Sequence, residues 1–250
     1  MIYDCFLYNG EKECLQIRCE ELKELDVTHV LIESSFTFSG KSNALKYWDF
    51  ANLYSYNVKP FLCNNVPNNG NAWDNEKTQR DYILTALEIL GAKDDDIVIV
   101  SDADEIPSMK AVKSYNSEMG LTALRMYNFW YKFNFLTEVK KWVAPKIMTY
   151  EYLKNTTPNE VRNSGFPSEI EYGGWHFSYA GDADYVINKI KSFSHQEFNT
   201  EQYINKKEVE RKINNGLSLW GESQFQKVEI DESFPKYLLY NQPKFKHLIA

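Results

Sequence analysis

The sequence has little basic charge, few cysteines and no long apolar segment, and each absence excludes a class of protein. Its 250 residues carry 28 lysines and arginines against 35 aspartates and glutamates, a formal net charge of −7. Nucleic-acid binding depends on clustered positive charge that pairs with phosphates, so we expect no nucleic-acid partner. The four cysteines, at positions 5, 14, 19 and 63, show no Cys-x-x-Cys spacing. We therefore expect reduced thiols rather than a zinc site or a disulfide framework.

Membrane signals are also missing. No window reaches the roughly 20 apolar residues of a membrane-spanning helix, and the N-terminus lacks the basic and apolar regions of a signal peptide. We expect a protein without a transmembrane segment in the cytoplasm, with a peripheral place at the membrane as the alternative. With only 11 glycines and 8 prolines, there is no linker-like stretch, and the length suits one large α/β domain.

Residues 97–107 hold the most informative pattern. Four β-branched residues, 97–100, are followed after Ser101 by two aspartates one residue apart, Asp102 and Asp104. Such a run predicts a strand buried on both faces of a parallel sheet, and open α/β sheets bind ligands at the carboxyl ends of these strands. Two converging carboxylates suit a hard divalent cation that also needs phosphate oxygens. The pattern predicts a metal and diphosphate site, and hence an enzyme that acts on a nucleotide sugar.

The aspartate pair has other interpretations. Acidic residues after a strand are common in ordinary loops and helix caps, and this alternative stays open. Aspartyl phosphatases also place Asp-x-Asp after a buried strand, but usually after the first strand, whereas about a hundred residues precede this one. A calcium loop of the EF-hand type needs Gly at its sixth position and Glu at its twelfth, where this chain has Pro107 and Lys113.

Strand-like and helix-like segments alternate before the aspartates. The expected strands cover residues 2–8, 27–32, 59–62 and the run before Asp102, and the expected helices cover 11–25 and 76–90. This alternation predicts a Rossmann-like α/β fold with a mostly parallel central sheet, whose strand ends share one crevice. Beyond Pro107 the pattern predicts aromatic strands within 121–135 and helices at 185–193 and 206–214.

Three charged residues are candidates for binding the nucleotide or its phosphates. Glu33 follows the second expected strand, where it is placed either to accept hydrogen bonds from a nucleoside or to cap the next turn. Lys77 and Arg80 are three residues apart on one helical face. They are placed either to reach a diphosphate or to lie on a solvated face.

A glycine pair precedes Trp175 and His176. Gly173 and Gly174 would permit a close approach of the backbone to a ligand, and an imidazole is a common metal ligand. The flat faces of Trp175 and Trp130 suit the apolar patch of a sugar ring, with packing in the core as the alternative.

Taken together, these stretches resemble glycosyltransferase family 17. Four segments carry the resemblance in the same order and spacing, namely residues 33–40, 102–107, 174–178 and 235–239. Asp-Ala-Asp-Glu-Ile-Pro at 102–107 is the most specific. The resemblance implies one GT-A-type transferase domain over residues 1–250, with 1–107 as the nucleotide-sugar half and 108–250 as the acceptor half.

The resemblance also implies the chemistry. A Mn²⁺- or Mg²⁺-dependent, inverting transferase would move a sugar, N-acetylglucosamine from UDP-N-acetylglucosamine, to a hydroxyl of an acceptor glycan. An acceptor glycan on a lipid carrier is one form that we expect. A non-catalytic glycan-binding protein on a degenerate transferase fold is the main alternative, and a glycoside hydrolase with two flanking carboxylates is the next.

Within this framework Asp104 is the expected direct metal ligand, and Asp102 is expected to reach the metal or the ribose. His176 would complete the metal shell or orient the acceptor, as a histidine late in the chain does in many transferases of this fold. The general base is expected many tens of residues after the aspartates, where the candidates are Glu171, Asp182, Asp184 and Glu197. Glu197 is our prediction, because His195 beside it can hold or tune its carboxylate.

Overall fold

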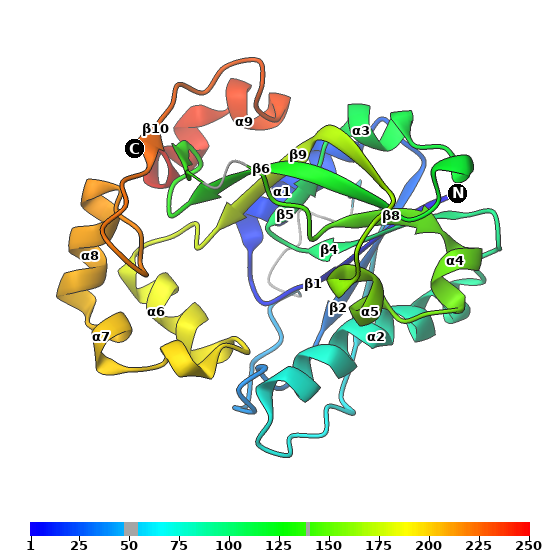
Figure 1. The fold of residues 1–250 in the computed structure, drawn as a ribbon, viewed down its shortest axis with the longest axis horizontal. Helices are drawn as coiled ribbons and strands as arrows, with labels where there is room; N and C mark the ends of the chain where they lie inside the picture. The colour runs from blue at the N-terminus through cyan, green and yellow to red at the C-terminus, as the bar shows by residue number, and fades with distance from the viewer. Residues whose placement is uncertain (48–54, 139–140) are drawn as a thin grey trace.

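The computed structural model describes residues 1–47, 55–138 and 141–250, and one mixed sheet runs through them (Figure 1). The strand order is β10-β7-β6-β8-β4-β1-β2-β3. Four of these strands are parallel neighbours, namely β1 (Ile2–Leu7), β2 (Val27–Glu33), β3 (Val58–Leu62) and β4 (Ile97–Asp102). This half matches the predicted parallel sheet, and its strands end together, because Leu7 pairs with both Ile32 and Asp102.

Helices cover both faces of the parallel half, which explains why its strands are mostly apolar. The α1 helix (Lys12–Leu22) lies between β1 and β2 in the chain, and α2 (Ala72–Leu90) lies between β3 and β4. On β1, Cys5 and Leu7 belong to the core cluster that contains residues of α2, whereas Phe6 belongs to the cluster that contains residues of α1. The alternation of side chains along a strand thus divides the apolar residues between two helices.

The α2 helix begins four residues before the predicted start. The side chain of Asn71 caps it by accepting a hydrogen bond from the backbone N–H of Trp73, and Gly91 ends it in the left-handed conformation with φ of 72°. An analysis of apolar spacing misses this start, because the buried residues of the first turn are Ala72 and the polar Asn75, while the large apolar Trp73 is exposed.

The second half of the chain makes the sheet mixed. The β8 strand (Lys146–Thr149) is antiparallel to β4, and β6 (Thr122–Trp130) is antiparallel to β8. The long β9 strand (Ser168–Ser178) runs parallel to β6 and pairs with the short β5 strand (Glu105–Pro107). Two edge strands, β7 (Phe135–Leu136) and β10 (Gln226–Lys227), complete the sheet. The α/β class is confirmed, and antiparallel strands join its parallel half.

The glycine pair in β9 serves this strand packing. A Cβ atom on Gly173 would lie 2.6 Å from the backbone nitrogen of Arg125, and one on Gly174 would lie 2.0 Å from the carbonyl oxygen of Ile106. Gly174 also has a φ of 144°, which disfavours other residues. The prediction that these glycines admit a ligand is therefore wrong, because the neighbouring strands already fill that space.

Shorter helices surround the sheet. Their bounds are α3 (Met109–Ser114), α4 (Tyr150–Lys154), α5 (Pro158–Asn163), α6 (Ala183–Ser192), α7 (Glu201–Ile204), α8 (Lys206–Asn215) and α9 (Lys236–Tyr240), with 3-10 turns η3 (Ser117–Met119), η4 (Gln196–Phe198) and η5 (Gln242–Leu248). Figure 1 shows α6, α7 and α8 together on one side of the molecule, away from α2, α4 and α5. Among the residues described, no helix has the length and apolarity needed to cross a membrane.

Candidate active site

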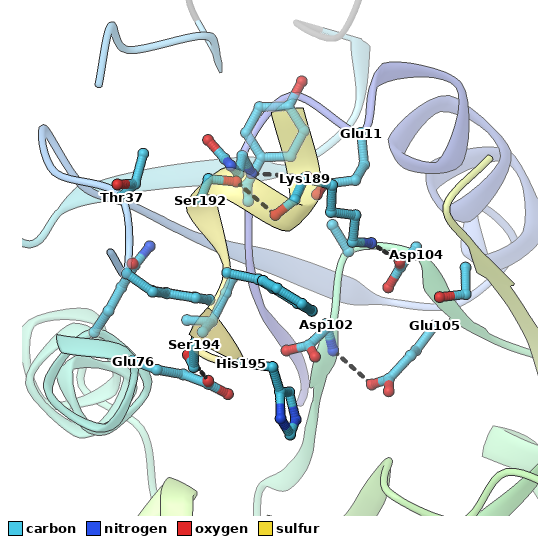
Figure 2. Close-up of a pocket in the computed structure, with 18 of the residues that line it drawn as sticks. Glu11, Thr37, Glu76, Asp102, Asp104, Glu105, Lys189, Ser192, Ser194 and His195 are labelled. Atoms are coloured by element: carbon cyan, nitrogen blue, oxygen red, sulfur yellow. Dashed lines mark hydrogen bonds and ion pairs between the residues drawn. The ribbon is translucent and has the colours of Figure 1, made fainter. Parts of the chain in front are cut away.

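A cavity of about 260 Å³ opens where β1 and β4 end, which is where the strand pattern places a ligand. Residues 7–9 and 102–105 form one wall, and residues of α2, α6 and the segment 36–38 form the others. Figure 2 shows the acidic side chains of Glu11, Glu76, Asp102 and Asp104 around the opening.

Asp102 is held between two arginines. Its Oδ1 accepts a hydrogen bond from Nη1 of Arg80 at 2.6 Å, and its Oδ2 accepts one from Nη2 of Arg162, also at 2.6 Å. Burial alone would raise the pKa of Asp102, but the two guanidinium groups, Arg162 first, hold that pKa well below its ordinary value. Asp102 is therefore ionised, and both of its oxygens are engaged.

Asp104 has a different environment. Its Oδ2 accepts a hydrogen bond from Nζ of Lys189 at 2.6 Å, whereas its Oδ1 lies 3.8 Å from Nε2 of His176. Burial would raise the pKa of Asp104, yet the positive charge of Lys189 lowers it. Asp104 thus keeps one carboxylate oxygen that faces an imidazole instead of a cation.

His176 is buried, and its Nδ1 has no hydrogen-bond partner among the residues that the structure describes. The Trp142 ring covers the imidazole, with centroids 4.5 Å apart and planes inclined by 30°. Burial lowers the pKa of His176 below its ordinary value, although Asp104 opposes the shift. A neutral imidazole beside a carboxylate is a suitable pair of metal ligands.

The third acid of the motif is structural. Glu105 is fully buried, and both of its oxygens accept hydrogen bonds from Arg162 at 2.8 Å. Glu105 also accepts from Nε1 of Trp142 at 2.5 Å and from the backbone N–H of Asp102 at 2.7 Å. These four bonds fix the turn that presents the two aspartates.

Arg18 supports the same turn from α1. Its guanidinium is fully buried and donates to the backbone carbonyls of Asp102 and Glu105, at 2.9 and 2.8 Å. Asp4 on β1 neutralises Arg18 through both oxygens, and Asp4 lies 2.8 Å from Nδ1 of His29 on β2. A network from three elements therefore positions the backbone at the end of β4.

The structure separates the predicted phosphate-binding pair. Arg80 is 1% exposed and bridges Glu76 and Asp102, so its charge positions Asp102. Lys77 is 52% exposed, pairs with Asp81 at 2.5 Å and does not line the cavity of the described structure. Lys77 thus lies on a solvated face, the alternative given for the pair, whereas Arg80 is buried against Asp102 at the edge of the cavity.

Glu33 lies at the end of β2 as predicted, but its carboxylate turns away from the cavity. It accepts hydrogen bonds from the backbone N–H groups of Lys46 and Tyr47. The cavity that the described residues form does not include it. Glu33 thus holds the backbone at Lys46 and Tyr47, which is a different role from the cap of the next turn that was the alternative.

The two predicted sugar-stacking tryptophans lie in the core. Trp175 is 8% exposed and donates from Nε1 to the carbonyl of Ser233 at 3.0 Å. Trp130 packs against an aromatic cluster that includes Tyr179 and Trp220. The described cavity is lined by other aromatic residues, namely Tyr8, Phe36, Phe38, Trp73, Trp142, Tyr179 and Phe193.

The predicted base Glu197 stands at the rim. Its carboxylate lies 2.7 Å from Nδ1 of His195, and it is His195 that lines the cavity. The Trp73 ring meets the imidazole of His195 edge-on at 4.5 Å between centroids. His195 lowers the pKa of Glu197, which is exposed.

The other base candidates have structural partners outside the described cavity. Glu171 pairs with Arg125 at 2.8 Å, Asp184 pairs with Lys206 at 2.6 Å, and Asp182 caps α6. None of these carboxylates is free to take a proton from a ligand in the cavity.

Several site residues escaped the sequence analysis, among them Glu11, Glu76, Arg162 and Lys189. Arg162 follows a recognisable helix start at Thr157 and Pro158 but reaches Asp102 only because the chain returns across the sheet. Lys189 lies on α6, which the sequence predicted as a helix over residues 185–193, but nothing in the sequence indicated that this helix turns Lys189 toward Asp104.

The charges around the cavity favour a ligand that brings positive charge. Five carboxylates line it in the described structure, from Glu11, Glu76, Asp102, Asp104 and Glu105. They face the lining cations Arg162 and Lys189, and Arg80, which binds Asp102 from α2. A diphosphate alone would add negative charge to this excess, so its entry with a divalent cation is the electrostatically favoured mode.

An acidic cavity at the carboxyl ends of parallel strands, covered by helices, is typical of α/β proteins that bind nucleotides. The sequence comparison names the family. The model of glycosyltransferase family 17 matches residues 1–250, and the chain belongs to that family.

Curated relatives agree with this assignment. Beta-1,4-mannosyl-glycoprotein 4-beta-N-acetylglucosaminyltransferase of Rattus norvegicus is 24% identical over 96% of this chain and 53% of its own length. The enzymes of the same name from Homo sapiens and Mus musculus are 24% and 23% identical over the same shares. The chain therefore spans about half the length of the curated relatives it matches.

Proposed function

We propose that this protein is a metal-dependent, inverting glycosyltransferase of the GT-A type that moves N-acetylglucosamine from UDP-N-acetylglucosamine to a hydroxyl of an acceptor glycan. Family membership and the names of the relatives support the reaction class. The observation that carries the proposal is the pair formed by Asp104 and His176 in an acid-rich cavity at the end of β4. The charges of this cavity suit a divalent cation bound together with a diphosphate better than they suit either ligand alone.

The residues present fit a Mn²⁺ or Mg²⁺ ion. Oδ1 of Asp104 and Nε2 of His176 are 3.8 Å apart, a separation that lets both contact one ion. The described residues contain no group of three or more acidic, histidine or cysteine ligands. Water and diphosphate oxygens would complete the shell, as is usual for Mg²⁺ in nucleotide sites. When bound, the ion would neutralise the leaving diphosphate.

We divide the lining of the cavity between the donor and the acceptor. We assign the nucleoside to the polar and aromatic wall at Tyr8, Asn9 and Phe36, near the ends of β1 and β2. We assign the acceptor sugar to the wall formed by Trp73 and His195. Their rings offer a flat surface and a hydrogen-bonding group, which a sugar uses together.

We propose that Glu197 and His195 act as one unit in taking the proton of the acceptor hydroxyl. His195 faces the cavity, and its Nδ1 is 2.7 Å from Glu197. A carboxylate at this distance orients the ring and stabilises its protonated form. The hydroxyl oxygen then attacks the sugar carbon opposite the departing diphosphate, which inverts that centre.

The alternatives make different predictions. A glycan-binding protein without catalysis would bind oligosaccharides but no nucleotide sugar. A glycoside hydrolase needs two available carboxylates that flank the glycosidic bond. Asp102 and Glu105 are both engaged by Arg162, which counts against that role for them.

Isothermal titration with a panel of nucleotide sugars, with and without Mn²⁺, tests the proposal. We expect Mn²⁺-dependent binding of UDP-N-acetylglucosamine that is lost in Asp104→Asn. The matched control is Asp184→Asn, because Asp184 pairs with Lys206 on the surface and should leave binding unchanged. If folded protein binds no nucleotide sugar, the transferase proposal is wrong, and the glycan-binding alternative gains support.

A further inference from the structure

Three cations contact the carboxylates of the aspartate turn, and they are bonded in two different ways. Arg80 bridges Glu76 and Asp102, and Arg162 bridges Asp102 and Glu105. Each arginine thus joins two carboxylates. Among the described residues, Lys189 forms an ion pair with Asp104 alone. A cation with a single carboxylate partner can leave it without releasing a second buried charge.

The position of Lys189 allows such a movement. The α6 helix is anchored by the buried side chains of Val186, Ile187 and Ile190, so the backbone at Lys189 is fixed. Its side chain is 23% exposed to the cavity, and Figure 2 shows it reaching from α6 toward Asp104. The ammonium also lies 5.2 Å from the centre of the Tyr179 ring, whose face can stabilise a cation.

Lys189 and a divalent cation need the same carboxylate. Asp104 is the expected metal ligand in the proposed function, on which this inference rests, and Lys189 holds its Oδ2 at 2.6 Å. Both oxygens of nearby Asp102 already accept hydrogen bonds from Arg80 and Arg162. A cation bound at Oδ1 of Asp104 would share that carboxylate with the ammonium of Lys189 and repel it, so the two compete for the negative charge of Asp104.

We propose that Lys189 is an exchangeable counter-ion, which neutralises Asp104 in the free protein and turns to the donor diphosphate when a divalent cation takes its place. The lysine stays protonated throughout, and its ammonium group moves from the carboxylate of Asp104 to a phosphate of the donor. In the free protein it prevents an uncompensated buried charge at Asp104. In the complex it stabilises the negative charge that the diphosphate gains as the sugar departs.

The test compares metal binding with nucleotide binding in Lys189→Met. Mn²⁺ alone is titrated first, followed by UDP in saturating Mn²⁺. We expect Lys189→Met to bind Mn²⁺ alone about tenfold more tightly, because the ammonium no longer competes for Asp104, and to bind UDP about tenfold more weakly. A lysine with a purely structural role would not move the two affinities in opposite directions.

Two further variants complete the design. Lys189→Arg keeps a cation beside Asp104 and should keep the Mn²⁺ affinity near that of the parent protein, which checks the result if Lys189→Met folds poorly. Lys206→Met removes an exposed lysine that pairs with Asp184, and it should change neither affinity.

The outcomes separate the two proposals. If the parent protein binds UDP with Mn²⁺ but Lys189→Met leaves Mn²⁺ binding unchanged or weaker, the exchange is wrong and the transferase proposal stands. If the parent protein binds neither Mn²⁺ nor UDP, both are wrong. Tighter Mn²⁺ binding together with weaker UDP binding supports the exchange.

Discussion

Replacing Arg162 with methionine should destabilise the protein more than any surface substitution. Arg162 is 10% exposed and makes three hydrogen bonds, one to Asp102 at 2.6 Å and two to Glu105 at 2.8 Å. Methionine fills part of the volume but carries no charge. Asp102 keeps Arg80, whereas Glu105, which is fully buried, loses its guanidinium partner.

The size of the effect follows from that unpaired charge. Removing one partner of a buried ion pair costs about 3–5 kcal/mol. Glu105 keeps two neutral donors, Nε1 of Trp142 and the backbone N–H of Asp102. We therefore expect a loss of stability at the lower end of that range, about 3 kcal/mol. For a chain of this length, that loss lowers the melting temperature by roughly 6–12 °C.

Urea unfolding at pH 7 measures the effect, with Arg211→Met as the control. Arg211 pairs with Glu208 and Glu222 on the surface, where screening leaves little net stabilisation, so its loss should not change the midpoint measurably. Adding Glu105→Gln to Arg162→Met should restore part of the stability, because it removes the unpaired charge. A loss under about 1 kcal/mol for Arg162→Met would refute the view that this arginine neutralises the turn.

Three further predictions concern the cavity and its support. Glu197→Gln should lower kcat about 100-fold and leave the Kd for UDP with Mn²⁺ unchanged, since Glu197 serves proton transfer; an unchanged kcat would remove it from the reaction. Trp73→Ala should raise the KM for the acceptor with little change in melting temperature, because Trp73 is 48% exposed. If the substitution weakens donor and acceptor binding equally, the assignment of Trp73 to the acceptor is wrong. The free energy of unfolding should fall as the pH drops below 3.8, the ordinary pKa of the carboxyl group. Arg18 and His29 overcome the effect of burial and depress the pKa of Asp4 in the folded state. The stabilisation by ionised Asp4 is therefore present above that pH and is lost as the pH falls below it. Urea midpoints at pH 6 and pH 3 measure this, and equal midpoints would contradict it.

The parallel half of the fold was predictable because its signals are local. Apolar runs of strand length, separated by helix-period segments, indicated β1, β2, β3 and β4 and their shared edge. That shared edge fixes the cavity, because the loops that leave β1, β2 and β4 line it together with Asp102.

The rest of the site depends on contacts between distant residues, which carry no local signal. Lys189 reaches Asp104 from 85 positions away, and Arg162 reaches Asp102 from 60. The strands β8 and β9 carry the chain back to the site, where α5 and α6 follow them. Aromatic residues that suit a core strand equally suit a sugar site. Trp175 was therefore assigned to a ligand although it packs in the core, and Trp73 was overlooked.

The two aspartates of the motif are equivalent in the sequence but divide their roles in the fold. Ala103 lies between them, and its backbone N–H donates a hydrogen bond to the carbonyl of Leu7 on β1. The carbonyl of Asp104 accepts a hydrogen bond from the backbone N–H of Phe177 on β9. The turn is thus tied to opposite parts of the sheet, which directs Asp102 toward the arginines of α2 and α5 and Asp104 toward Lys189. Because only Asp104 faces an imidazole and an exchangeable cation, neutralising Asp104 should abolish Mn²⁺ binding, whereas neutralising Asp102 should chiefly loosen the turn.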